Sequence, residues 1–247
     1  MSMLPDLHNA RRLLCVQPHY DDNDIGAGGT LAALHDHGAE IIYLTVTDDL
    51  VGVLDTTLSD EQATAQLRAE QGEAGAQIGV SRHYWLGCPD AGDYDYFEVR
   101  RLVIAHIRML KPDFIFTCDP WLLYEAHRDH VMTGLAVAEA SILHTMPRLA
   151  STPQADRDYQ PYSITGVAFY YTGAPNAVSE IDATHERKHA ALDSYRAQFA
   201  PEDFAILHAR LGEMEEACAE GLPIQYGEPL KVLHTHQLHV GINTWKS

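Results

Sequence analysis

The sequence of 247 residues has few cysteines and no long apolar run, and these absences exclude several classes of protein. Its four cysteines are widely separated and form no CxxC pair, so neither a zinc ribbon nor a disulfide framework is expected. No segment approaches the ~18 uninterrupted apolar residues of a membrane-spanning helix. Residues 1–10 contain no apolar segment of the kind found in secretory signals. We therefore expect a cytoplasmic protein with no membrane partner.

Basic residues are also scarce, with 17 Lys and Arg against 35 Asp and Glu, for a formal net charge of -18. A chain with this charge repels nucleic-acid phosphates and anionic lipid surfaces at long range. We therefore expect no nucleic-acid partner. The simplest consequence of the charge is solubility, although it also suits a substrate or product that carries an amine.

A glycine-rich segment at Gly26, Gly28 and Gly29 lacks the third glycine of a dinucleotide-binding fingerprint, because Leu31 occupies that position. Aspartates just before this segment would repel a pyrophosphate, which binds bare backbone N–H groups at the start of a helix. The sequence also has no Walker lysine. A nucleotide-binding oxidoreductase is therefore disfavoured, and we expect the glycines to let the start of a helix pack close to a sheet.

Apolar strand-like segments alternate with helical ones along the chain. Strands are expected at residues 12–17, 41–46, 83–86, 114–118 and 167–171. Helices are expected at residues 30–37, 59–77, 98–110, 129–143, 180–199 and 205–220, and an extended segment at 231–240. Ser59 and Gln62 predict a capping box for the second helix, which should end near Gly79. The alternation predicts a mostly parallel, Rossmann-like α/β sheet of order 3-2-1-4-5, with helices on both faces, in a single domain spanning residues 1–247.

Unusual polar residues follow two of the expected strands, in a chain that contains 15 histidines. Residues 18–24 (PHYDDND) follow the first strand, and residues 127–130 (HRDH) lie in the segment after the fourth. Ligands of open α/β sheets bind beyond the carboxyl ends of the strands, where the strand order reverses. Because strands one and four are neighbours in the expected order, both segments should face the same crevice.

Such a crevice would bring several carboxylates together, and a divalent cation would remove their mutual repulsion. Zinc binds histidine nitrogen and aspartate oxygen, and a catalytic zinc keeps one position for water. His19, Asp22 and His130 would supply three ligands, and Asp21 would remain beside the bound water as a general base. Iron(II), cobalt or nickel would fit the same ligands.

Each of these residues has a simpler explanation when it is taken alone. Asp21, Asp22 or Asp129 could be a helix N-cap, and His127 or His130 could be an ordinary surface histidine. That explanation requires both clusters to fall at strand ends by accident, so we favour the metal site. A metal-binding protein without catalysis would have little use for a spare carboxylate beside an open position of the metal.

Both clusters resemble motifs of the PIG-L/LmbE-like zinc-dependent de-N-acetylase family. His19-x-Asp21-Asp22, followed by Gly28-Gly29-Thr30, resembles the first motif, and His127-x-Asp129-His130 resembles the second. Further matches are Arg68 with Glu70, Asp90, and the residues Lys188, Ala191, Leu192 and Gln198 of a later helix. The segments at 119–121 (DPW), 170–172 (YYT) and 226–228 (YGE) look closest to the diacetylchitobiose deacetylase branch.

The resemblance implies a zinc-dependent hydrolase that removes the N-acetyl group of an amino sugar, such as N-acetylglucosamine or diacetylchitobiose. It implies the same three metal ligands and the same general base as above. It further implies that His127 stabilises the oxyanion and that Asp129 orients His127. Substrate contacts are expected from Arg68, Asp90, Asp119 and His239.

The resemblance also implies a homo-oligomer, a hexamer or a trimer-based assembly, in which a histidine near the C-terminus reaches the site of a neighbouring subunit. His239 aligns best with that histidine, and His234 and His236 are the alternatives.

Three residues depart from the pattern of the family. Tyr20 and Arg128 stand where the family usually has proline, and Tyr195 stands where histidine is common. None of them is an expected metal ligand, but each could reshape the pocket. A zinc amidase of the same fold, acting on a non-sugar N-acyl compound, is therefore the alternative function.

Overall fold

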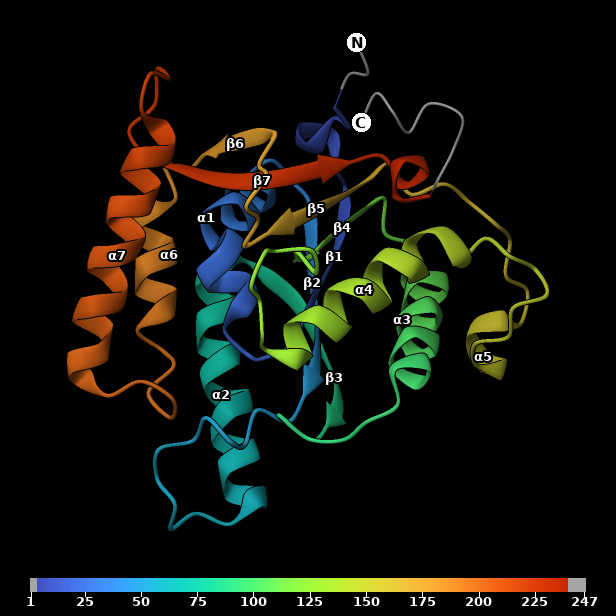
Figure 1. The fold of residues 1–247 in the computed structure, drawn as a ribbon, viewed down its shortest axis with the longest axis horizontal. Helices are drawn as coiled ribbons and strands as arrows, with labels where there is room; N and C mark the ends of the chain where they lie inside the picture. Colours follow the sequence, from blue (N-terminus) through green and yellow to red (C-terminus); the bar gives the residue numbers. More distant parts are fainter. Residues whose placement is uncertain (1–3, 240–247) are drawn as a thin grey trace.

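A seven-stranded sheet crosses the centre of the protein in the computed structural model, which describes residues 4–239 (Figure 1). Its strands are β1 (Arg12–Gln17), β2 (Glu40–Thr47), β3 (Val80–Cys88), β4 (Phe114–Cys118), β5 (Gly166–Tyr170), β6 (Ala177–Glu180) and β7 (Gly227–Leu233). They lie in the order β3-β2-β1-β4-β5-β7-β6. Strands β1 to β5 pair in parallel, whereas β7 pairs antiparallel with β5 and with β6. The predicted order of the parallel strands is confirmed, and two antiparallel strands extend it.

Helices cover both faces of this sheet (Figure 1). They are α1 (Asp22–Asp36), α2 (Asp60–Ile78), α3 (Tyr96–Leu110), α4 (Arg128–Leu143), α5 (Pro153–Asp156), α6 (His185–Leu192) and α7 (Pro201–Ala219), with two 3-10 turns, η1 (Leu7–Asn9) and η2 (Thr235–Leu238). Helices α1, α2 and α6 pack together on one face, and α3 packs against α4 on the other. Within residues 4–239, no helix is both long and apolar enough to cross a bilayer.

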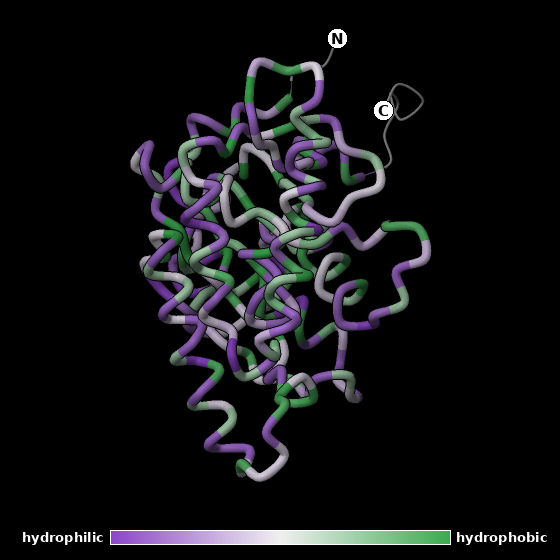
Figure 2. The backbone as a smooth tube through the Cα atoms, turned by 90° about the vertical axis from the view of Figure 1, so that its left-hand side faces the viewer, coloured by the Kyte–Doolittle hydropathy of each residue, from purple (hydrophilic) through white to green (hydrophobic). Residues whose placement is uncertain are grey.

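Successive side chains of the central strands point to opposite faces of the sheet, so the core consists of two hydrophobic clusters. Leu13 and Cys15 of β1 belong to the cluster under α1 and α2, whereas Leu14 and Val16 belong to the cluster under α3 and α4. All four side chains are fully buried. Coverage on both faces explains why the central strands are continuous apolar runs. Figure 2 shows hydrophobic segments gathered mainly in the interior of the molecule.

Helix α1 begins at Asp22, earlier than the expected start at residue 30, so the glycine-rich segment is itself helical, with a kink at Ala27. A β-carbon at position 29 would lie 2.8 Å from Ile181, and one at position 26 would collide with the ring of Tyr170. Close packing against the sheet is confirmed at Gly26, which faces β5, whereas Gly29 packs against the segment that follows β6. The expected position of the helix start is wrong, because a helical glycine is tolerated where the neighbouring element leaves no room for a side chain.

The second helix matches its prediction closely. The side chain of Ser59 accepts a hydrogen bond from the Gln62 N–H at 3.3 Å, and the Gln62 side chain accepts one from the Ser59 N–H at 2.9 Å. Helix α2 ends at Gly79, which has a left-handed φ of 96°. All four cysteines are free, as expected.

The region after β5 differs most from the prediction. Residues Ala177–Glu180 form strand β6, and α6 spans only His185–Leu192 instead of 180–199. Strand β7 begins at Gly227, before the expected extended segment, and a 3-10 turn replaces that segment at Thr235–Leu238. Pairing with β7 holds the short β6 in an extended conformation, which the local sequence does not favour.

Candidate active site

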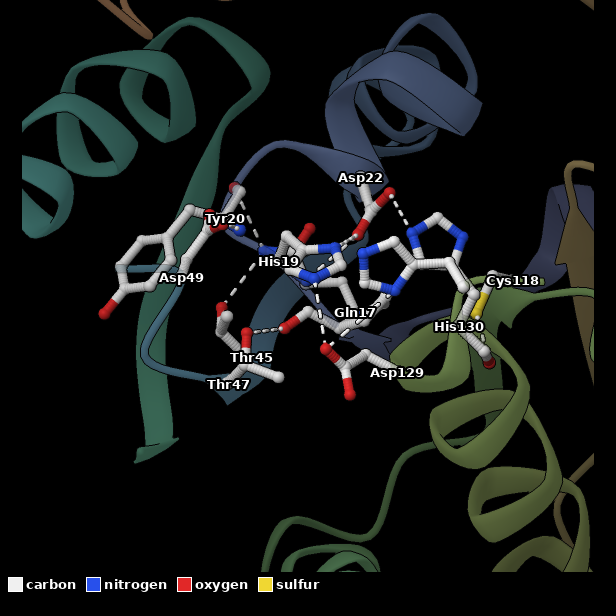
Figure 3. A network of polar contacts seen from close by, with 12 residues as sticks. Gln17, His19, Tyr20, Asp22, Thr45, Thr47, Asp49, Cys118, Asp129 and His130 are labelled. Atoms are coloured by element: carbon white, nitrogen blue, oxygen red, sulfur yellow. Dashed lines mark hydrogen bonds and ion pairs between the residues drawn. The ribbon is translucent and has the colours of Figure 1, made fainter. Parts of the chain in front are cut away.

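The two polar segments expected to share a crevice meet beyond the carboxyl ends of β1 and β4 (Figure 3). His19 Nδ1 lies 3.1 Å from Asp22 Oδ2, and His130 Nε2 lies 3.5 Å from Asp22 Oδ1. One ligand atom from each of the three residues lies within 4.8 Å of the others. The structure therefore brings together the three side chains predicted as metal ligands. Two imidazoles and one carboxylate are a suitable set for zinc or a related transition metal.

Buried hydrogen bonds fix the loop between β1 and α1. The carbonyl oxygen of Tyr20 accepts hydrogen bonds from the side chains of Gln17 at 3.2 Å, Gln71 at 2.9 Å and Tyr195 at 3.0 Å. These donors come from β1, from α2 and from the loop between α6 and α7. They hold the backbone next to His19 and so set the direction in which its ring points.

The ring of His130 is oriented by two neighbours. Tyr171 stacks on it with a centroid distance of 5.9 Å and an interplanar angle of 9°. His130 Nδ1 lies 3.6 Å from Glu125 Oε2, while Nε2 faces Asp22. A metal-bound histidine commonly engages its second nitrogen with a carboxylate or carbonyl. This arrangement suits Nε2 of His130 as a ligand atom.

A second possible metal cluster shares His19 and lies at its other ring nitrogen. His19 Nε2 is 3.4 Å from Asp90 Oδ1 and 3.6 Å from Asp129 Oδ2, and His127 completes the group. The Nε2 atom is buried without a well-formed hydrogen bond. Asp90, which was expected to contact substrate, is thus also a candidate metal ligand.

The contact expected between His127 and Asp129 is loose in this structure. His127 Nδ1 lies 3.9 Å from Asp129 Oδ2, which is beyond hydrogen-bond range. Asp129 is buried, and it accepts hydrogen bonds from the Ala91 N–H at 2.9 Å and the Tyr94 hydroxyl at 2.8 Å. The side chain of His127 is 45% exposed. Asp129 is therefore fixed, while His127 has room to move.

Carboxylates outnumber cations in this site, and the pKa values reflect that excess. Burial lowers the pKa of His19, but the carboxylates of Asp22 and Asp90 beside its ring outweigh this effect and raise the pKa to about 12. Burial raises the pKa of Asp21 well above its ordinary value, and the charges of Asp22 and Asp49 raise it further. Burial also raises the pKa of Asp49 to about 7. The site therefore favours an added positive charge, which a metal cation supplies.

Helix capping does not account for the paired aspartates. Asp21 stands at the N-cap position of α1, but its side chain makes no capping hydrogen bond. The carboxylate of Asp22 instead accepts a hydrogen bond from the N–H of His19 at 2.9 Å. Both side chains are buried at this edge of the sheet, so helix capping does not explain their positions.

Three of the four predicted substrate contacts stand outside the possible metal clusters of residues 4–239: Arg68, Asp119 and His239. The guanidinium of Arg68 lies 4.6 Å above the ring of Trp85. Asp119 accepts a hydrogen bond from the Trp121 N–H at 2.9 Å and lines a hollow of about 320 Å³. His239 is exposed at the end of the described residues.

Sequence reasoning missed two residues that shape the site. Asp49 follows β2 at the same edge of the sheet, so the signal that identified the other clusters was present there as well. Its carboxylate accepts the N–H of Tyr20 at 2.9 Å. Tyr94 lies in a loop without a recognisable pattern, and only the folded chain places its hydroxyl against Asp129.

Known proteins resemble this chain in sequence and in structure. Residues 14–141 match the PIG-L family, described as GlcNAc-PI de-N-acetylase. The diacetylchitobiose deacetylase of Thermococcus kodakarensis is 33% identical over 199 residues, which cover 79% of this chain and 73% of that protein. The 1D-myo-inositol 2-acetamido-2-deoxy-alpha-D-glucopyranoside deacetylase 2 of Saccharopolyspora erythraea is 25% identical, over 77% of this chain and 84% of that protein.

A solved structure, the N,N'-diacetylchitobiose deacetylase of Pyrococcus horikoshii in complex with its inhibitor, superposes with a TM-score of 0.88 at 33% identity. The superposition covers 97% of this chain and 90% of that one. The predicted resemblance, including its diacetylchitobiose deacetylase branch, is confirmed. The chain belongs to the PIG-L family of de-N-acetylases.

Proposed function

We propose that the protein is a zinc-dependent hydrolase that removes the N-acetyl group of N-acetylglucosamine or of a small chitooligosaccharide such as diacetylchitobiose. The observation that carries the proposal is the convergence of His19, Asp22 and His130 beside the buried Asp21. The two chitobiose deacetylases that resemble this chain support the choice of substrate. The non-sugar N-acyl amidase remains the second candidate, because Tyr20 and Arg128 depart from the family pattern.

In this proposal His19, Asp22 and His130 would hold the metal. The alternative cluster is less suitable, because the carboxylate of Asp129 already accepts hydrogen bonds from Ala91 and Tyr94. Three protein ligands leave one position for water, as in other catalytic zinc sites. A bound divalent ion polarises the acetyl carbonyl and lowers the pKa of water from about 15.7 toward about 7.

Asp21 acts as the general base in this scheme. Its carboxylate accepts a proton from the attacking water and then donates that proton to the departing amine, which carries the sugar. Burial and the neighbouring carboxylates raise its pKa in the chain alone. A cation held by Asp22 would lower that pKa and so favour the ionised carboxylate with which Asp21 accepts the proton.

His127 donates a hydrogen bond to the oxygen that becomes negative during the reaction, and Asp129 orients His127. For Asp129 to accept a hydrogen bond from His127, the 3.9 Å separation between His127 Nδ1 and Asp129 Oδ2 must shorten. Arg68, Asp90 and Asp119 hold the sugar. In a cytoplasmic homo-oligomer, His239 reaches the site of a neighbouring subunit, with His234 and His236 as alternatives.

A panel of N-acetyl compounds tests the choice of substrate. Purified protein of known metal content is incubated with N-acetylglucosamine, diacetylchitobiose and N-acetylated amino acids of similar size. Faster release of acetate from the sugars supports the proposal. Release from the amino acids alone would transfer the assignment to the non-sugar amidase, with the same metal site.

A further inference from the structure

A second group of metal-binding side chains lies between α6 and α7, which run side by side in Figure 1. His185 and His189 are four residues apart on α6 and share one face of the helix, opposite Glu215 of α7. The Nε2 atom of each histidine lies 3.1 Å from Glu215 Oε2. Two tetrahedral zinc ligands with bonds of about 2.0–2.2 Å stand roughly 3.3–3.5 Å apart. The spacing therefore suits a single ion.

A chain of hydrogen bonds behind His189 leaves its Nε2 atom available as a ligand. His189 Nδ1 lies 2.6 Å from His208 Nδ1, and His208 Nε2 lies 2.7 Å from Asp193 Oδ1. The two ring nitrogens of His189 thus face different partners, Nδ1 the ring of His208 and Nε2 the carboxylate of Glu215 at 3.1 Å. In the tautomer that donates Nδ1–H to His208, Nε2 is available to a cation beside Glu215. A metal-bound histidine commonly engages its second nitrogen in this way.

The charged groups around Glu215 carry an excess of negative charge, which favours the binding of a cation. Lys188 Nζ lies 2.6 Å from Glu215 Oε1 and 2.8 Å from Glu228 Oε1, and all three side chains are fully buried. One ammonium group thus faces two carboxylates, and a buried charge without compensation is costly. Lys188 engages Oε1 of Glu215, while Oε2 faces the histidines.

The His185 ring is held in a position that suits metal binding. It stacks on Tyr226 with a centroid distance of 3.7 Å and an interplanar angle of 13°. Its Nε2 atom is buried without a well-formed hydrogen bond. A buried imidazole nitrogen of this kind, 3.1 Å from a carboxylate oxygen of Glu215, is available as a metal ligand.

We propose that His185, His189 and Glu215 bind a second divalent ion, Zn²⁺, with water as the fourth ligand. The ion would tie α6 to α7 on a part of the fold that the proposed reaction does not use. Its role is therefore structural, and it does not depend on the identity of the substrate.

The number of zinc ions bound per chain tests this proposal. The Asp22→Asn variant, which disrupts the active-site ligands, is stripped with a chelator, incubated with Zn²⁺, dialysed and assayed by mass spectrometry of the metal. We expect one zinc per chain. Adding His185→Gln and His189→Gln should reduce this number to zero. His106→Gln serves as the control, because that histidine is partly buried on α3 and its ring bonds only locally, to the Leu102 carbonyl at 2.8 Å.

No zinc in the Asp22→Asn chain, or one zinc that persists without both histidines, would overturn the proposal. Either result would leave the proposed deacetylase reaction untouched, because activity is measured on the wild-type chain.

Two measurements keep the test informative if the histidine variants fold poorly. At a zinc concentration about 100-fold above Kd, the Tm of Asp22→Asn should rise by roughly 5–10 °C. Co²⁺ added to the same variant should give the intense visible absorption of a four-coordinate ion. An unchanged Tm together with the weak spectrum of aqueous Co²⁺ would contradict the proposal.

Discussion

At the scale of single residues, the proposed reaction depends most on the side chain of Asp21. Its carboxylate is buried next to Asp22 and makes no capping hydrogen bond to α1. Burial and the neighbouring carboxylates raise the pKa of Asp21, and a cation bound beside it would lower that pKa. Catalysis and metal binding should therefore be separable by substitution at this position.

Asp21→Asn should keep the active-site metal and lower kcat by about 10²–10⁴-fold, because the amide has the same shape but cannot accept the proton. Metal analysis and the rate of acetate release measure the two effects. Asp36→Asn is the control, since Asp36 lies in the same helix and pairs at the surface with Arg187 at 3.0 Å. Wild-type turnover in Asp21→Asn would remove Asp21 from the role of base.

His83 of β3 should make stability depend on pH. Burial lowers its pKa to about 4, whereas an unfolded histidine has a pKa of about 6.5. Between these values the unfolded chain binds the extra proton, so the contribution of His83 to stability is lost as pH falls from about 6.5 toward about 4.

His83→Phe should reduce the proton uptake on unfolding near pH 5 by about one. The phenyl ring keeps the stack on Trp85, whose ring lies 5.9 Å away at 9°. Urea unfolding of both proteins between pH 4 and pH 7 measures the difference. The same slope of stability against pH in wild type and variant would show that His83 is not the group responsible.

At the scale of secondary-structure elements, the prediction succeeded where burial of an element gives its sequence a clear apolar pattern. Strands β1, β2, β4 and β5 were predictable because coverage on both faces produces short apolar runs between helical segments. Strand β6 was not, because its four residues are held by pairing with β7 and not by their own pattern. The same distinction applies to the site, where residues at strand ends were predictable but the loop residue Tyr94 was not.

Glu228 of β7 links three elements and should be important for their assembly. Its carboxylate accepts hydrogen bonds from the N–H groups of Gly29 and Thr30, at 3.0 and 2.7 Å, just after the kink in α1. It also pairs with the buried Lys188 of α6 at 2.8 Å. No exposed residue could replace this combination of contacts.

Glu228→Gln should therefore lower the free energy of unfolding by roughly 2–4 kcal/mol, since the neutral amide weakens the buried, charge-assisted hydrogen bonds from Gly29, Thr30 and Lys188. Urea unfolding in the presence of a chelator measures the loss without a contribution from bound metal. Glu220→Gln, at an exposed position after α7, should change stability by less than about 0.5 kcal/mol. Equal stability of the two variants would contradict the assigned role.

At the scale of the whole molecule, an exposed apolar loop between β4 and α4 suggests a surface for association. Trp121, Leu123 and Tyr124 are 57%, 73% and 91% exposed. Grouped apolar side chains on a surface commonly mark a site of protein contact. The expected homo-oligomer could use this loop.

Leu123→Asp combined with Tyr124→Asp should then reduce the mass of the assembly measured by light scattering after size exclusion. Ile206→Asp, at an exposed apolar position on α7, should leave the mass unchanged. A wild-type protein that is monomeric, or an assembly that the double substitution does not affect, would argue against this surface.

The central claim is metal-dependent release of acetate from an N-acetylated amino sugar. Its most direct test is the rate of acetate release from N-acetylglucosamine and diacetylchitobiose, on protein whose metal content is known. The account predicts release that a chelator abolishes and Zn²⁺ restores. Release that persists after all metal has been removed, or a chain that takes up no metal at His19, Asp22 and His130, would contradict it.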